Sequence, residues 1–228
     1  MTCGNFYGEC LRARCIHLSS VVMFSAMMLC AAAQVRAFDS LPPREVATGT
    51  LQAAFSPWDD IEGLITQEIT GARHQILVQA YILTNRPIAA ALIAAKQRGV
   101  EVQILVDEQQ LKNNAATQVA RLAAANIPVW VETKYRSAHN KVIVIDPLGK
   151  DAVVITGSFN FTWSAQHKNA ENVLIVRGNP LLARRYSMNW QRHRSDARRL
   201  PDLAKQTTNV PDQAVVKVNT ASPAVLQP

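Results

Sequence analysis

Cysteine is missing from most of the chain, because none follows Cys30. The stretch that holds all four cysteines has the pattern of a secretory signal. Two arginines precede an apolar run, residues 16–33, which lacks acidic residues, and a small-residue cleavage site ends at Ala37. We therefore expect residues 1–37 to be removed on export, leaving a periplasmic or secreted chain without thiols or disulfides. A retained membrane anchor is the alternative, since the run approaches the length that spans a bilayer.

Recognisable metal-binding patterns are missing as well. The sequence has no H-E-x-x-H motif and no grouping of acidic residues like that of a two-metal nuclease, so we expect neither a metal nor another cofactor. Acidic residues are also few: 17 stand against 24 lysines and arginines, which gives a formal net charge of +7. A basic chain suits a polyanionic partner, either nucleic acid or an anionic lipid surface.

No internal repeat divides the chain, and 228 residues with 48% hydrophobic content suit one domain with a substantial core. Residues 38–48 contain two adjacent prolines and little periodicity, which is typical of a linker. The folded domain is predicted over residues 49–195. Residues 196–228 are largely polar and aperiodic and are predicted to form a flexible tail.

Helical periodicity alternates with short runs rich in β-branched residues across this domain. Such alternation predicts an α/β fold, with a mixed and mostly buried β-sheet flanked by helices. The expected helices cover 59–70, 87–98, 111–125 and 180–194, and the expected strands cover 75–83, 101–107, 128–132, 141–146, 151–156 and 172–176.

One motif carries recognisable chemistry. His139 and Lys141 stand at the start of the apolar segment KVIVID, and residues two apart on a strand face the same side. Ser158 and Asn160 likewise stand two apart after DAVVIT and can point together toward a phosphate. A lysine, a hydroxyl and an amide supply the hydrogen-bond donors that an anionic phosphoryl transition state needs.

These residues resemble the phospholipase D superfamily, whose signature is H-x-K-x4-D followed by G-[GS]-x-N. His139, Lys141 and Asp146 fit the first part, and the segment from Gly157 to Asn160 fits the second. The resemblance implies a phospholipase D-like fold, with His139 as the nucleophile and Lys141, Ser158 and Asn160 as the phosphate-binding residues.

Two acidic residues complete the catalytic set that the resemblance implies. The family places a carboxylate at the distance of Glu171 to hold the histidine ring, which would fix the tautomer and leave the other ring nitrogen free to attack phosphorus. Asp146 belongs to the signature, but about 15 to 20 Å of extended chain separates it from His139. We therefore expect Asp146 to hold a local turn rather than to touch substrate.

Members of the superfamily pair two such motifs across one active site, where one histidine attacks and the other protonates the leaving oxygen. This chain has only one motif, because none of its other four histidines has a lysine two positions later. The second motif must then come from another copy of the chain, in a two-fold homodimer. The resemblance is specifically to the short, exported bacterial endonucleases, and it implies a metal-independent phosphodiesterase that cleaves DNA or RNA through a covalent phosphohistidine.

Two alternative functions and one question about a surface remain at this stage. A phospholipase D or transphosphatidylase would use the same pocket on a phospholipid. A catalytically idle protein would keep the fold only to bind nucleic acid. The arginine-rich stretch from Arg184 to Arg199, which includes Trp190, either extends a phosphate-binding surface or forms a solvated helix face with its aromatic residues packed inward.

Overall fold

The computed structural model describes residues 41–42, 44–114 and 116–200. The predicted signal segment lies outside the described residues, as does the predicted tail beyond residue 200. The chain divides into a unit that ends at Arg44 and a unit that begins at Glu45, and the fold below is that of the second unit.

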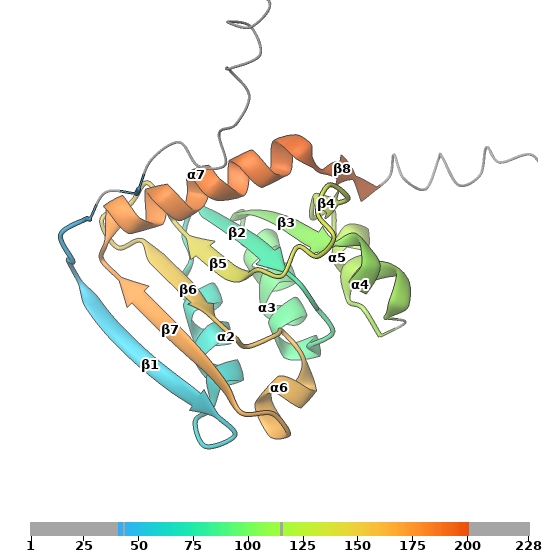
Figure 1. The fold of residues 1–228 in the computed structure, drawn as a ribbon, viewed down its shortest axis with the longest axis horizontal. Coiled ribbons are helices and arrows are strands. Elements are labelled where there is room, and N and C mark those ends of the chain that lie inside the picture. Colours follow the sequence, from blue (N-terminus) through green and yellow to red (C-terminus); the bar gives the residue numbers. More distant parts are fainter. Residues whose placement is uncertain (1–40, 43, 115, 201–228) are drawn as a thin grey trace, which may run out of the picture. The chain divides into compact units, whose positions relative to one another are not determined.

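An eight-stranded mixed sheet runs through this unit in the order β1-β7-β6-β5-β2-β3-β4-β8 (Figure 1). Strands β2, β3 and β4 are parallel to one another, while the other neighbouring strands pair antiparallel. The strands are β1 (Thr50–Ser56), β2 (Gln75–Ala80), β3 (Glu101–Asp107), β4 (Val129–Glu132), β5 (Lys141–Ile145), β6 (Val153–Gly157), β7 (Glu171–Arg177) and β8 (Arg198–Arg199).

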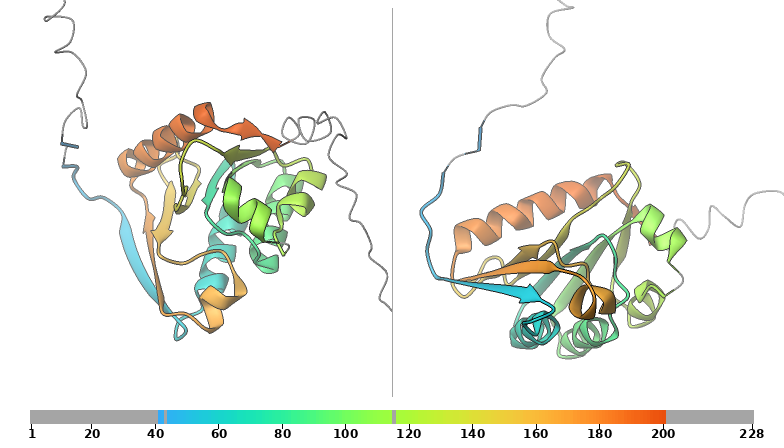
Figure 2. Two further views of the ribbon diagram at one scale, coloured as in Figure 1. Left: turned by 45° about the vertical axis from the view of Figure 1, so that its right-hand side comes forward. Right: turned by 60° about the horizontal axis from the view of Figure 1, so that its bottom comes forward.

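Helices cover both faces of the sheet, which makes three layers. Figure 2 shows α7 on one side, with α2, α3 and α5 on the other. The helices are α2 (Ile61–Gly71), α3 (Arg86–Gln97), α4 (Glu108–Asn113), α5 (Val119–Ala124), α6 (Trp163–His167) and α7 (Pro180–Asp196). No helix within the described ranges is both long enough and apolar enough to cross a membrane.

Strand alternation divides the core into two parts. On β5, Ile143 and Ile145 join the larger core beneath α2 and α3, while Val142 and Val144 join the smaller core beneath α7. Both sets are buried because this strand lies inside the sheet and is covered on both faces. The chain direction brings the carboxyl ends of β2, β3, β4 and β6 to the same sheet edge as the amino ends of β5 and β7.

The predicted α/β class is confirmed, and each predicted strand overlaps an observed one. The prediction of one helix over 111–125 was wrong, because the chain there forms α4 and α5 with a break between them. Gln118 N donates to Leu83 O at 2.9 Å, so a tertiary hydrogen bond takes the place of the next helical one. The tail was predicted to begin too early, since α7 extends to Asp196 and β8 pairs with β4.

Candidate active site

His139 is the second-last residue of the loop that joins β4 to β5, and Lys141 is the first residue of β5. The loop is tied down by Asp107, whose buried carboxylate ends β3. Asp107 Oδ2 accepts a hydrogen bond from Ala138 N at 2.8 Å, and its Oδ1 accepts one from Gln110 N at 2.9 Å, which caps α4. The residue just before His139 is therefore fixed to the sheet edge, while His139 itself stays exposed.

Tyr81 holds the two signature residues together. Its ring centroid lies 4.3 Å from that of His139, and Lys141 Nζ lies 4.6 Å from the Tyr81 ring centroid, in cation–π geometry. Lys141 Nζ also donates to His139 O at 3.0 Å, and Tyr81 OH accepts from Gln110 Nε2 at 2.9 Å. Sequence reasoning missed Tyr81, which lies inside the strand predicted over 75–83, whereas the observed β2 ends at Ala80.

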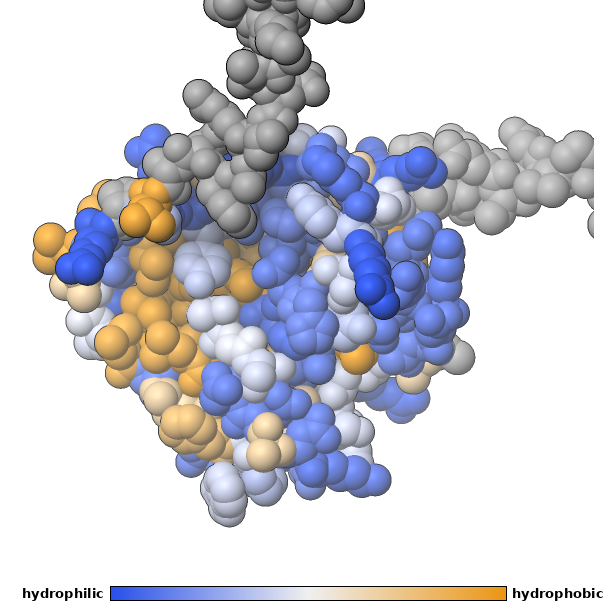
Figure 3. Space-filling view, viewed as in Figure 1, coloured by the Kyte–Doolittle hydropathy of each residue, from blue (hydrophilic) through white to orange (hydrophobic). Residues whose placement is uncertain are grey.

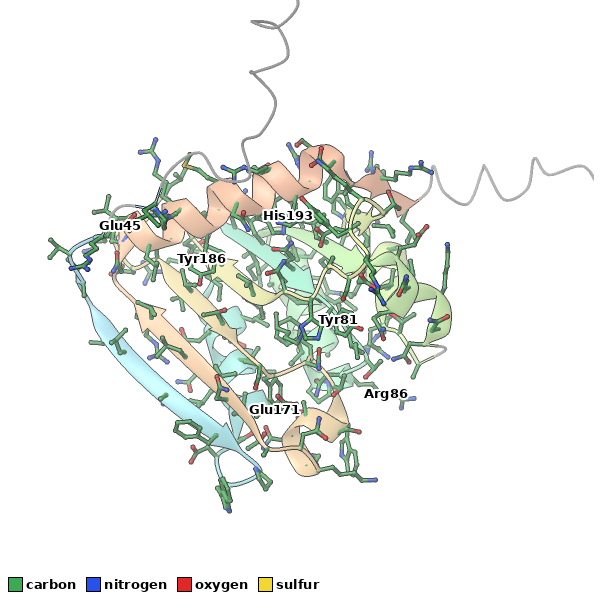
Figure 4. All side chains as sticks on the ribbon, in the orientation of Figure 1. Glu45, Tyr81, Arg86, Glu171, Tyr186 and His193 are labelled. Atoms are coloured by element: carbon green, nitrogen blue, oxygen red, sulfur yellow. The ribbon has the colours of Figure 1, made fainter. Side chains whose placement is uncertain are left out.

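Lys141 is the buried cation of this edge, with 6% of its surface exposed. Burial lowers the pKa of its ammonium below the usual 10.5, and the nearby Glu171 carboxylate opposes that shift. Both residues begin strands, β5 and β7, which β6 separates in the sheet. Figure 4 shows Tyr81 and Glu171 along this edge, with Glu171 beside α6.

Ser158 is held by Asn172 in the neighbouring strand. Ser158 Oγ accepts from Asn172 N at 3.0 Å and from Asn172 Nδ2 at 3.2 Å, while Ser158 N donates to Asn172 O at 3.1 Å. Because the hydroxyl oxygen accepts from both Asn172 N and Asn172 Nδ2, its own proton remains available for a phosphate oxygen. The preceding Gly157 is required here, since a Cβ atom would lie 2.2 Å from Asn172 O.

Asn160 follows at the same edge. Its Oδ1 is buried and has no hydrogen-bond partner among the described residues. A buried polar atom without a partner costs about 1 to 3 kcal/mol, so Asn160 is a poor choice for stability alone. The structure thus brings His139, Lys141, Ser158, Asn160 and Glu171 to one edge of the sheet.

The structure separates Asp146 from this group, although the signature counts it with the catalytic residues. It lies just beyond the far end of β5, with φ of 47°. Its carboxylate accepts hydrogen bonds from the backbone amides of Arg73, His74 and Gln75, at 2.7–2.9 Å. Asp146 therefore joins β5 to the turn between α2 and β2.

The hydrogen bond predicted between Glu171 and His139 is not formed in the structure. Glu171 Oε1 instead accepts from Asn169 Nδ2 at 2.9 Å, and the electrostatic partner of Glu171 is Lys141. The reason is the strand order, because β6 lies between the strands that begin with Lys141 and Glu171. The sequence spacing alone did not reveal this separation.

The arginine-rich helix α7 packs its aromatic residues inward. Trp190 is buried and donates from Nε1 to Val78 O at 2.9 Å, and Arg194 Cζ lies 5.5 Å from the ring centroid of Trp130 in β4. On the same face of the sheet, His193 Nδ1 lies 2.5 Å from Oε1 of the buried Glu132. Trp190, His193 and Arg194 thus attach α7 to the sheet.

Residues 65–193 match a family model described as "Cardiolipin synthase, PLD-like domain". The chain belongs to the phospholipase D family. The solved structure of Nuc from Salmonella typhimurium, described as a phospholipase D family member, is 34% identical with a TM-score of 0.62, covering 67% of this chain and 98% of that one. The phospholipase D-like fold predicted from the motif is therefore confirmed.

Two further relatives carry names that include an activity. A phospholipase D of Rickettsia prowazekii is 40% identical over 146 residues, which are 64% of this chain and 68% of that protein. A mitochondrial cardiolipin hydrolase of Xenopus laevis is 26% identical over 125 residues, 55% of this chain and 57% of that protein. As a member of the phospholipase D family, the chain is a phosphodiesterase, and its reaction is hydrolysis.

Proposed function

We propose that the chain is a metal-independent endonuclease that cleaves DNA or RNA through a covalent phosphohistidine in a homodimeric active site. The observation that carries the proposal is the cluster of His139, Lys141 and Tyr81. In this cluster His139, the proposed nucleophile, lies beside the ring of Tyr81, and so does the buried ammonium group of Lys141. The cation takes the charge-stabilising role that a metal ion has in other nucleases.

In the first step, neutral His139 attacks phosphorus and a P–N bond forms. The bond from phosphorus to the leaving oxygen breaks, and that oxygen takes a proton from the protonated His139 of the second copy. Lys141, Ser158 and Asn160 donate hydrogen bonds to the phosphoryl oxygens, on which negative charge increases in the transition state.

In the second step, water attacks the phosphohistidine. The imidazole that gave up its proton now takes one from the water, so the P–N bond breaks and both histidines return to their starting states. Glu171 supports both steps by favouring the charged form of Lys141, because its carboxylate opposes the effect of burial on the pKa of the lysine.

A homodimer supplies the second histidine, and an apolar surface beside the site supports it. Leu51 and Phe55 of β1 and Leu174 of β7 are 66%, 49% and 37% exposed, on the sheet face opposite the larger core. Figure 3 shows apolar residues gathered over this part of the sheet. Phe55 pairs with Asn172, which binds Ser158, so the apolar surface continues into the site. Such a surface suits a second copy of the chain.

Nucleic acid is favoured as the substrate by the excess of lysine and arginine over acidic residues, which persists without residues 1–37, and by the single motif. A phospholipid is the second candidate, because relatives that are 38–40% identical are named phospholipase D. Either substrate would meet the protein outside the cytoplasm if residues 1–37 direct export, which we also propose from their sequence pattern.

The test incubates plasmid DNA with the chain, with His139→Ala and with His74→Ala, in excess EDTA. His74 is an exposed histidine at the opposite end of the sheet, so its replacement is the matched control. We expect strand breakage by the wild type and His74→Ala, and binding without breakage by His139→Ala. The wild type is also incubated with RNA and with labelled phospholipid. If it cleaves neither DNA nor RNA but hydrolyses the phospholipid, the nuclease proposal fails and the lipid substrate replaces it.

A further inference from the structure

The short helix α6 carries an exposed aromatic side chain, Trp163, and lies in the sequence between Asn160 and Glu171. Trp163 is 55% exposed. Its ring centroid lies 4.7 Å from that of His167, one turn later, and Lys168 Nζ lies 5.3 Å from the Trp163 ring centroid. An indole, an imidazole and an ammonium group therefore form one surface patch, the Trp163 patch.

The helix beneath this patch is fixed by buried hydrogen bonds. Ser56 Oγ donates to Ala165 O at 2.7 Å, and Gln166 Nε2 donates to Asp59 O at 2.9 Å. Gln166 Oε1 also accepts from Glu62 N at 2.9 Å. Ser56, Ala165 and Gln166 are all buried, so α6 is held to β1 and α2 while the Trp163 patch faces outward.

The chain path places the Trp163 patch next to the phosphate-binding residues. Trp163 is three residues after Asn160, and Lys168 is three residues before Glu171. Figure 1 shows α6 at the sheet edge where β7 begins, and Figure 4 shows Glu171 beside it. A nucleic acid strand that extends from a phosphate at Lys141 toward the start of β7 would run past α6.

We propose that the Trp163 patch stacks an unpaired base of the substrate, so that the enzyme prefers single-stranded nucleic acid. This inference rests on the proposed nuclease function. The π face of an indole stacks on any base, and Lys168 beside it favours the adjoining phosphate, which is the arrangement of sequence-tolerant single-strand binders. A duplex keeps its bases paired within the helix, where Trp163 does not reach them.

Another exposed tryptophan provides a matched control. Trp58 lies between β1 and α2 and is 82% exposed, but it is followed by Asp59 and Asp60 rather than by cationic residues. Carboxylates repel phosphate, so Trp58 is not expected to bind a nucleic acid strand. Both tryptophans are exposed, and their replacement should leave the fold intact.

The experiment measures kcat/KM of the wild type, Trp163→Ala, Trp163→Phe and Trp58→Ala on a single-stranded oligonucleotide, its duplex and an abasic strand of equal length. For Trp163→Ala we expect a loss of about 5- to 150-fold on the single strand and no loss on the duplex or abasic strand. Trp163→Phe should recover much of the loss, and Trp58→Ala should match the wild type.

Equal losses on the normal and abasic strands, or no loss at all, would overturn base stacking while leaving the nuclease proposal intact. An unchanged kcat/KM together with weaker binding of Trp163→Ala to anionic phospholipid vesicles would assign the Trp163 patch to a lipid surface, and would also overturn the inference. Wild-type protein that cleaves none of the three nucleic acids would instead refute the proposed function.

Discussion

Replacing Asp146 tests whether this signature residue stabilises the fold rather than taking part in cleavage. Its carboxylate accepts three backbone hydrogen bonds, from Arg73, His74 and Gln75. At about 1 kcal/mol for each bond at this partly exposed position, Asp146→Ala should lower the free energy of unfolding by about 3 kcal/mol. The positive φ adds about 1 kcal/mol of strain for alanine, which lacks the side-chain hydrogen bonds that favour this conformation.

Together these amount to a loss of about 4 kcal/mol, which corresponds to a fall in Tm of about 8 to 16 °C for a domain of this size. Asp146→Asn should lose about half as much, because its single carbonyl oxygen can still accept from His74 N and Gln75 N. The control is Asp151→Ala, an exposed carboxylate nearby, which should change stability by less than about 0.5 kcal/mol. The assay follows Tm by circular dichroism and cleavage at 25 °C, where each variant is still folded. An unchanged Tm with lost cleavage in Asp146→Ala would refute the structural role.

Two further predictions concern the residues around His139. Tyr81→Phe keeps the ring beside His139 and Lys141 but loses the hydrogen bond from Gln110, so kcat should fall by less than about 10-fold. Tyr81→Ala removes both ring contacts, so its kcat should be lower by at least about a further 10-fold. Equal kcat values for the two variants would contradict this. Lys141→Met should abolish cleavage yet raise Tm at pH 7, since burial lowers the pKa of Lys141 and its charged form is disfavoured in the folded state. This gain in Tm should shrink as pH rises from the lowered pKa of the folded state toward 10.5, above which the lysine is neutral in the folded and the unfolded state. A gain in Tm that grows with pH would mean that folding raises the pKa of Lys141, and would contradict the prediction.

The sheet was largely predictable because its strands are continuous apolar runs that only burial on two faces explains. Short polar elements were not predictable. Helix α6 spans only Trp163–His167, too few residues to show helical periodicity, and it depends on hydrogen bonds with Ser56 and Asp59, which are distant in sequence. The break between α4 and α5 likewise depends on a hydrogen bond to Leu83, which is distant in sequence.

The candidate site was predictable where its residues share a strand end and are two positions apart, as for His139 and Lys141. Contacts between distant segments were not. Tyr81 precedes His139 by two strands and several helices, and only the pairing of β2 with β5 brings them together. The position of Glu171 relative to Lys141 depends in the same way on the strand order.

The most direct test of the central claim is to trap the covalent intermediate. The enzyme would be mixed with an end-labelled single-stranded oligonucleotide in EDTA, quenched within milliseconds under alkaline denaturing conditions that preserve phosphohistidine, and digested for mass spectrometry. The proposed mechanism predicts a peptide that carries the phosphoryl group and one cleavage fragment on His139, and no such peptide from His139→Ala. Efficient cleavage by the wild type with no adduct on His139 at any quench time, or an adduct on another residue, would contradict it.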